Sequence, residues 1–321
     1  MTRMPALFFT ALSLLFSPLA YAGLLTDQAI VIDGHTRTYN LYVPEATPNT
    51  PRPLVLLLHG HFGDADSMTG KRLRRSAYKI WPKIAEREGW ILVIPNGSIG
   101  PDGYRGWNDC RADAETNPDT DDVKFLNALV DSVAQQYPVN PQRIYVNGTS
   151  NGGNMAFRLA QESGDKYRAI AAIVASMPQK NKCTPVNTPV SVLVMNGTED
   201  PLLPYQGGGV GKDTSDNKDR GTVLSTRKTI DYWIGVNAIT GAPNRKDLPD
   251  ISKRDKSTVH IEQHRNEDTA MEVTLYEVRG GGHTEPSLSE HHRRFYKLIV
   301  GHQNRDMEMA EHVWSFFERN P

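Results

Sequence analysis

The sequence predicts a single α/β domain in which helices cover both faces of a mostly parallel central sheet. Apolar segments of strand length alternate along the chain with segments of helical periodicity, as they do in folds built from parallel strands. Residues 54–58 form a continuous apolar run, which is typical of a strand buried on both faces. The 321 residues suffice for one large domain with a core of its own.

The strands are expected in the following order. An opening antiparallel pair and a late hairpin or sheet edge flank the strands of the central sheet. The opening pair comprises residues 29–32 and 39–43, the central strands comprise 54–58, 90–94, 144–146, 169–174 and 190–195, and the late pair comprises 259–264 and 273–278.

Helices are expected at residues 75–87, 121–137, 151–162 and 307–318. The second of these carries apolar residues at helical spacing, and acidic residues at its start complement the helix dipole. Two polar stretches, 207–222 and 237–257, are expected to be surface loops or insertions rather than domain boundaries.

Residues 1–22 have the character of a cleaved signal peptide. Arg3 precedes an apolar region over 6–19, and an Ala-x-Ala site ends at Ala22. We therefore expect a signal peptide at 1–22, a single α/β domain at 23–321, and a secreted or periplasmic protein. In an oxidising compartment Cys110 and Cys183 are expected to form a disulfide, with two buried thiols as the alternative.

Charge excludes some classes of partner. The formal net charge is −1, so no polycationic surface is indicated, and neither nucleic acid nor a membrane is an expected partner. Nothing in the sequence indicates the oligomeric state.

The strongest chemical signal is Gly148-Thr149-Ser150-Asn151-Gly152. It follows an apolar strand and precedes a helix, which is the context of the nucleophile elbow in α/β-hydrolases. The flanking glycines let the strained turn pack closely against its neighbours. Ser150 is therefore the predicted nucleophile.

A serine nucleophile needs a base and a residue that orients the base, and in this fold the chain order is serine, acid, histidine. Asp200 follows the strand at 190–195, and His283 follows the strand at 273–278 after three glycines. We predict that Ser150, Asp200 and His283 form a triad. Glu199 is the alternative acid.

The oxyanion hole is expected to use backbone amides. In this fold one donor follows the nucleophile, here Asn151, and the other lies in the loop after an early strand. His61 in the loop after residues 54–58 fits the second position. Metal binding by His59 and His61 is disfavoured because no partner at ligand spacing accompanies them. Trp107 is predicted either to contact substrate or to pack in the core.

The chain also resembles a family of secreted esterases that groups bacterial polyhydroxybutyrate depolymerase-like proteins with feruloyl and acetylxylan esterases. The resemblance covers about residues 30–317 and rests on the stretches HGHFGDAD, GWNDC, DDVKFLNALVD, RIYVNGTSNGGNMAFRLA, VLVMNGTEDPLLPYQGG, GTVLSTRKTIDYW and GGGHTEPS. It implies an α/β-hydrolase fold, no metal, no cofactor, and a triad at Ser150, Asp200 and His283. The family often has Trp where this chain has Glu285, which is thus a candidate substrate contact.

These observations predict a serine carboxylic-ester hydrolase that acts on a small-molecule or oligomeric ester. Feruloyl, acetyl and hydroxyalkanoate esters all fit. A serine peptidase of the same fold is one alternative, although such peptidases usually add a propeller or a cap. A catalytically silent binding protein is the other, and the intact triad argues against it.

Overall fold

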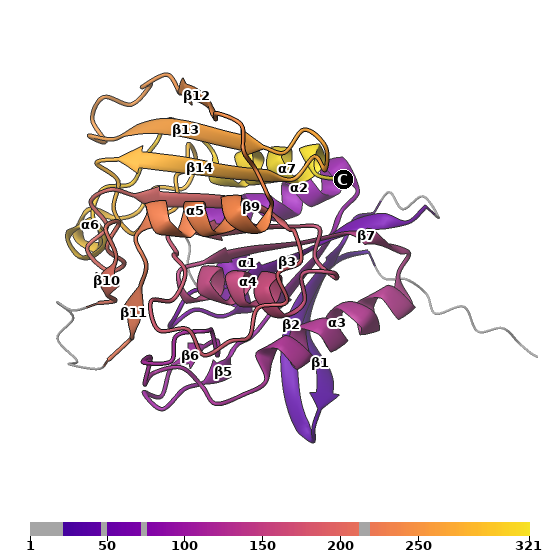
Figure 1. Cartoon of the computed structure of the whole chain (residues 1–321). Coiled ribbons are helices and arrows are strands. Elements are labelled where there is room, and N and C mark those ends of the chain that lie inside the picture. The colour runs from indigo at the N-terminus through magenta and orange to yellow at the C-terminus, as the bar shows by residue number, and fades with distance from the viewer. Residues whose placement is uncertain (1–21, 46–49, 72–75, 212–218) are drawn as a thin grey trace, which may run out of the picture.

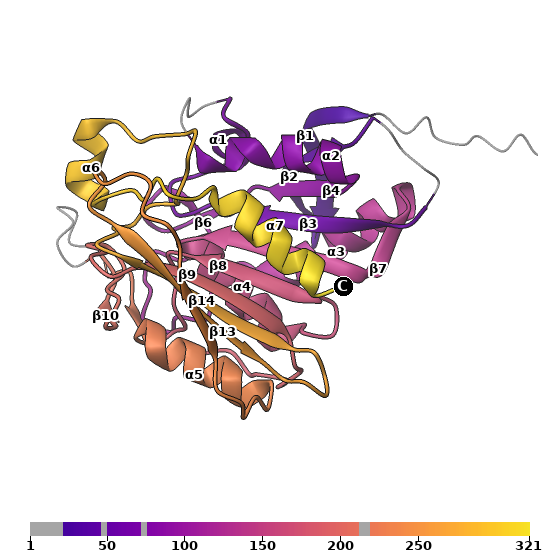
Figure 2. The same cartoon turned by 90° about the horizontal axis from the view of Figure 1, so that it is seen from above.

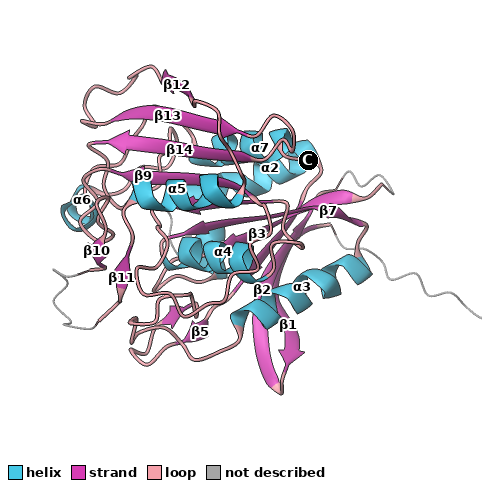
Figure 3. Ribbon diagram, in the orientation of Figure 1, coloured by secondary structure: helices cyan, strands magenta, loops and turns pink. Residues whose placement is uncertain are grey.

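One large sheet runs through the described part of the chain, residues 22–45, 50–71, 76–211 and 219–321 of a computed structural model (Figures 1 and 3). The strands from β4 to β14 in its spatial order run parallel to one another, and the remaining strands are added antiparallel at the two edges. In that order the strands are β1 (Gly23–Ile32), β2 (His35–Val43), β4 (Ile91–Pro95), β3 (Arg52–Leu58), β7 (Val139–Thr149), β8 (Ala169–Ile173), β9 (Ser191–Gly197), β14 (Glu272–Arg279), β13 (Thr258–Arg265) and β12 (Asn244–Asp247).

Both faces of the central strands are buried, and each face has its own core. Along β3, Leu54, Leu56 and Leu58 join the cluster that packs on α3 (Asp122–Gln136), α4 (Asn151–Glu162) and α5 (Thr226–Val236). The alternate residues Val55 and Leu57 join the cluster on α1 (Ala65–Thr69), α2 (Trp81–Glu88) and α7 (Met309–Arg319). Figure 2 shows α1, α2 and α7 on one side of the sheet and α5 on the other. This arrangement confirms the predicted fold class.

Most predicted elements are present, and the differences have local causes. The helix expected at 75–87 begins as the 3-10 helix η1 (Ala77–Ile80), and α2 follows with Pro82 in its first turn, where a proline costs no hydrogen bond. The stretch 237–257, expected to be a loop, contains the edge strand β12. All four residues of β12 are exposed, so its sequence lacks the alternation that marks a strand.

Several short elements surround the carboxyl ends of the parallel strands. The helix α6 (Arg294–Val300) was not expected from the sequence. Two-residue strands pair as β5 (Ser98–Ile99) with β6 (Arg105–Gly106) and as β10 (Gly208–Gly209) with β11 (Thr222–Val223). The loop expected at 207–222 lies partly outside the described residues, as does the predicted signal peptide except for Ala22.

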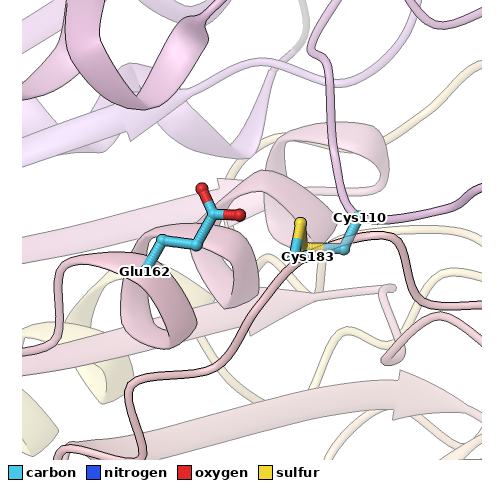
Figure 4. Close-up of side chains that lie close together, drawn as sticks. All are labelled: Cys110, Glu162 and Cys183. Carbon is cyan, nitrogen blue, oxygen red and sulfur yellow. A yellow bond between two sulfur atoms is a disulfide. The ribbon is translucent and has the colours of Figure 1, made fainter.

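The predicted disulfide between Cys110 and Cys183 is confirmed. It ties the segment after β6 to the segment between β8 and β9 (Figure 4). The carboxylate of Glu162, at the end of α4, lies beside it. These three residues are close enough to hold a metal ion, but the two sulfur atoms are bonded to each other and offer no thiolate ligand.

Replacing both Cys110 and Cys183 with serine should lower the free energy of unfolding by about 4 kcal/mol, because the crosslink then no longer restricts the unfolded chain. The expectation follows from the sequence separation of 73 residues between the cysteines. Denaturant unfolding followed by circular dichroism measures the change. A variant that unfolds at the wild-type midpoint with the wild-type slope would contradict it.

Candidate active site

Ser150 lies at a sharp turn between β7 and α4. Its backbone has φ 53° and ψ −123°, a strained conformation for a residue with a side chain. The turn is possible because the neighbouring backbone comes very close. A Cβ atom on Gly148 would lie 2.1 Å from the Gly152 carbonyl oxygen, and one on Gly152 would lie 2.3 Å from the Leu58 oxygen. The local geometry is that of the nucleophile elbow of an α/β-hydrolase.

The sheet brings the other two predicted residues to Ser150. Asp200 follows β9 and His283 follows β14, and these strands are parallel neighbours whose carboxyl ends meet at the same edge. His283 Nε2 lies 3.0 Å from Ser150 Oγ, and His283 Nδ1 lies 2.7 Å from Asp200 Oδ2. The nucleophile, base and orienting acid are therefore within hydrogen-bond reach of one another.

Asp200 rather than Glu199 faces the histidine. Asp200 is buried, and its second oxygen, Oδ1, accepts hydrogen bonds from the amides of Leu202 and Leu203, each at 2.8 Å. These bonds fix the carboxylate in the plane from which it reaches His283. The residue before it, Glu199, is exposed to solvent, and the hydrogen bond with the imidazole is made by Asp200.

The charges around His283 determine its protonation. Burial alone would lower the pKa of its imidazole, but the charge and hydrogen bond of Asp200, together with the charge of Glu285, outweigh burial and raise the pKa above its ordinary value. A histidine with a raised pKa is a stronger base toward the serine hydroxyl.

The loop after β3 is organised by His59. This side chain is buried, and its Nε2 accepts a hydrogen bond from the Gly97 amide at 2.9 Å, so its Nδ1 carries the proton and donates to the Gly60 oxygen at 2.7 Å. Burial lowers the pKa of His59 to about 4, which keeps the ring neutral. His59 thus shapes the loop, and both of its nitrogens are engaged with the backbone.

The two amides expected to bind an oxyanion come from the loop after β3 and from the start of α4. The His61 amide makes no hydrogen bond with the described residues, and its side chain is held by Asp102, with Nε2 and Oδ2 2.7 Å apart. Asn151 is the first residue of α4, where amides have no partner within the helix. Both amides are available to a developing negative charge.

A buried ion pair that the sequence did not indicate holds Asn151. Its side-chain amide nitrogen donates to Asp109 Oδ2 at 2.8 Å, and its oxygen accepts from the Trp107 amide at 2.7 Å. Asp109 in turn pairs with Arg111 at 2.7 Å, and both are buried. A carboxylate and an arginine two residues apart are common on protein surfaces, so only the distant contact to Asn151 reveals their role.

Trp107 does not line the pocket, and the expectation that it contacts substrate is corrected. The side chain is fully buried, and its indole nitrogen donates to the His59 carbonyl oxygen at 2.8 Å. The alternative, core packing, holds. The ring centroids of Trp107 and His59 lie 5.0 Å apart, so Trp107 supports the same loop that His59 shapes.

A cavity of about 830 Å³ opens beside Ser150. Its volume is in the range of sites for small molecules. Two exposed aromatic side chains, Phe62 and Tyr104, contact each other at its wall with ring centroids 4.4 Å apart. Glu285 lines the same cavity, as do Tyr296 and Ile299 of α6. The site therefore combines a nucleophile with a pocket of mixed polar and aromatic character.

Comparisons with known proteins place the chain among esterases. A family model described as "Putative esterase" matches residues 32–315. The "Putative esterase NocK" of Nocardia uniformis subsp. tsuyamanensis is 29% identical over 91% of this chain and 82% of that protein. "Feruloyl esterase B" of Piromyces equi is 28% identical over 63% of this chain, and the "Probable feruloyl esterase C" of Aspergillus niger is 26% identical over 54%.

The matched regions are only part of some relatives. They span 35% of the Piromyces protein and 58% of the Aspergillus niger protein. Among solved structures, "Acetyl xylan esterase from Aspergillus awamori" superimposes with a TM-score of 0.48 at 15% identity, over 77% of this chain and 89% of that one.

The raised pKa of His283 leads to a titration test. The protonated imidazole should persist to higher pH in the wild type than in Asp200→Asn, because removing the aspartate charge leaves burial to lower the pKa. NMR of the imidazole nitrogens over a pH series measures both midpoints. Glu199→Gln, which removes an exposed charge, is the control and should leave the midpoint in place. An equal midpoint in Asp200→Asn and wild type would refute the assignment of Asp200.

Proposed function

The chain belongs to the putative esterase family and is a carboxylic ester hydrolase, and we propose that it works through an acyl-enzyme formed on Ser150. The observation that carries this proposal is the contact of 3.0 Å between Ser150 Oγ and His283 Nε2, with Asp200 on the opposite nitrogen. A serine hydroxyl is a weak nucleophile by itself, and this arrangement supplies the base that activates it.

In the proposed first step Ser150 Oγ attacks the ester carbonyl carbon while His283 Nε2 takes its proton. The tetrahedral intermediate collapses, the carbon–oxygen bond to the alcohol breaks, and His283 returns the proton to the leaving alcohol oxygen. Water then attacks the acyl-serine with His283 again as base, which releases the acid and restores Ser150. Asp200 keeps the imidazole in the required tautomer and stabilises its positive charge.

The proposed oxyanion hole consists of the backbone amides of His61 and Asn151. Each donor in such a site is worth about 3 kcal/mol of transition-state stabilisation. The Asp109 contact to Asn151 and the His59 contacts within the preceding loop support the proposal, because donors held in place before the reaction need not be reorganised during it.

We propose that the substrates are short soluble esters or oligomers, such as feruloyl, acetyl or hydroxyalkanoate esters. A cavity of about 830 Å³ suits a ligand of this size, and the exposed rings of Phe62 and Tyr104 are among the side chains that line it. The names of the relatives include feruloyl and acetylxylan esterases. Rates on methyl ferulate, acetylated xylan and hydroxybutyrate oligomers separate these classes.

We also propose export, with a signal peptide at 1–22 and a mature domain at 23–321. The disulfide between Cys110 and Cys183 supports a secreted or periplasmic location, because such bonds persist in oxidising compartments. Within the described residues, no helix has both the length and the apolar character needed to span a bilayer.

Ser150→Ala should reduce kcat/KM for 4-nitrophenyl acetate by about four orders of magnitude, because the acyl-enzyme can no longer form. Steady-state kinetics measures the loss, and circular dichroism with a thermal melt checks that the variant folds. Near-normal turnover by a folded Ser150→Ala protein would contradict the proposed mechanism.

Asp200→Asn should reduce kcat by about four orders of magnitude, as expected when the acid can no longer fix the histidine tautomer. Glu199→Gln is the matched control and should keep kcat within about twofold of wild type. Both variants are compared in the same ester assay. The reverse ranking would show that Glu199 is the acid.

A further inference from the structure

Glu285 is a carboxylate in the wall of the cavity, two residues after His283. Its Oε1 accepts a hydrogen bond of 2.6 Å from the hydroxyl of Thr149, the residue before Ser150. Its Oε2 lies 3.8 Å from Nε2 of His292, which also lines the cavity. The side chain is 18% exposed, and Glu285 contributes to the surface that a ligand would meet. The carboxylate is thus held at one oxygen by a hydrogen bond, has His292 beside the other, and lines the cavity.

This carboxylate is charged at neutral pH. Burial acts to raise the pKa of Glu285, but the interaction with His292 and then the hydrogen bond from Thr149 outweigh burial and lower the pKa to about 2. Burial, and then the negative charge of Glu285, raise the pKa of the phenols of Tyr78 and Tyr296. A fixed negative charge beside the nucleophile must therefore act on any charged group that a substrate brings into the cavity.

The other charged side chains of the described cavity wall differ from Glu285 in their partners or in their position. Arg111 is paired with the buried Asp109, and Asp102 is paired with the His61 ring. Arg220 lies over the ring of Phe62, 5.6 Å from its centroid, in the part of the wall that also contains Tyr104. Glu285 instead belongs to the part of the wall that contains His292, close to His283.

The proposed mechanism indicates which half of the ester, the acyl group or the alcohol, lies near Glu285. The carbonyl oxygen binds at the amides of His61 and Asn151, whereas the oxygen of the leaving alcohol must reach His283 Nε2 to receive its proton. The alcohol is thus the part of the substrate that lies along the residues next to His283, and Glu285 is one of them.

We propose that Glu285 is a specificity-determining residue that selects against esters whose leaving alcohol carries a carboxylate. This inference rests on the proposed function. An anionic alcohol would meet the fixed carboxylate at short range, whereas a neutral alcohol, including one with hydroxyl groups that donate to Glu285, would not be repelled.

Two acetate esters of equal shape test the proposal: 4-acetoxybenzamide, which is neutral, and 4-acetoxybenzoate, which carries a carboxylate. The ratio of their kcat/KM values at pH 8 is compared in wild type, Glu285→Gln, Glu285→Asp and Glu290→Gln. Glu285→Gln removes the charge but keeps an oxygen for Thr149. Glu285→Asp keeps the charge. Glu290→Gln removes a charge five residues away that pairs with Lys79.

Wild type should prefer the neutral ester, and Glu285→Gln should reduce that preference by about tenfold, because the repulsion between the two carboxylates is then removed. Glu285→Asp and Glu290→Gln should keep the wild-type ratio. An unchanged ratio in a folded Glu285→Gln protein overturns the inference, and so does an equal loss of preference in Glu290→Gln.

Failure of the proposed function would look different, because wild type would then hydrolyse neither ester. If Glu285→Gln does not fold, Glu285→Ala carries the test, because it removes the same charge. The preference for the neutral ester should fall in Glu285→Ala as well. An unchanged preference in folded Glu285→Ala overturns the inference in that case.

Discussion

The close packing of β7 against α4 is the constraint on which the rest of the site depends. Ser150 has a backbone conformation that costs about 1–3 kcal/mol, and it persists only because the surrounding structure leaves no alternative. Because Gly148 and Gly152 lack side chains, the turn that carries Ser150 packs directly against the last carbonyl group of β3, that of Leu58. The first amides of α4 follow Ser150 directly in the same turn. A methyl group at either glycine would therefore disturb the nucleophile and the anion site together.

Around this turn, buried polar groups hold the site through contacts that are distant in sequence. Asp109 reaches Asn151 from 42 residues away, and the next residue, Cys110, is bonded to Cys183. The loop that carries Asp109 is therefore anchored by a covalent bond at one end and by the Arg111 ion pair within it. Burying a carboxylate without partners would cost several kcal/mol, so the partners are required for folding as well as for positioning. Stability and preorganisation depend here on the same contacts.

The sequence predicted the features that depend on contiguous residues or on the order of elements along the chain. The run 54–58 indicated a buried strand, and Ser150 was found because its strand, glycines and helix are contiguous. Asp200 and His283 followed from chain order and from their positions after strands, and the structure brings both to Ser150. The sequence did not indicate Asp109, because its partner is remote, or β12, because a strand exposed along its whole length has no apolar alternation. It left Trp107 undecided between pocket and core, since only the distant His59 carbonyl decides where the indole nitrogen lies.

Two carboxylates act on His283, and their different contacts give them different effects. Asp200 bonds directly to Nδ1, so its effect depends on geometry and fixes the tautomer. Glu285 has its oxygens directed to Thr149 and His292, so it acts on His283 only through its charge, which extends into the cavity as well. The charge of Glu285 raises the pKa of His283 without a hydrogen bond between them. The same electrostatic field therefore also acts on a substrate in the cavity. An apolar residue at this position would remove this contribution, whereas Glu285 couples the basicity of His283 to the selection of the alcohol that His283 must protonate.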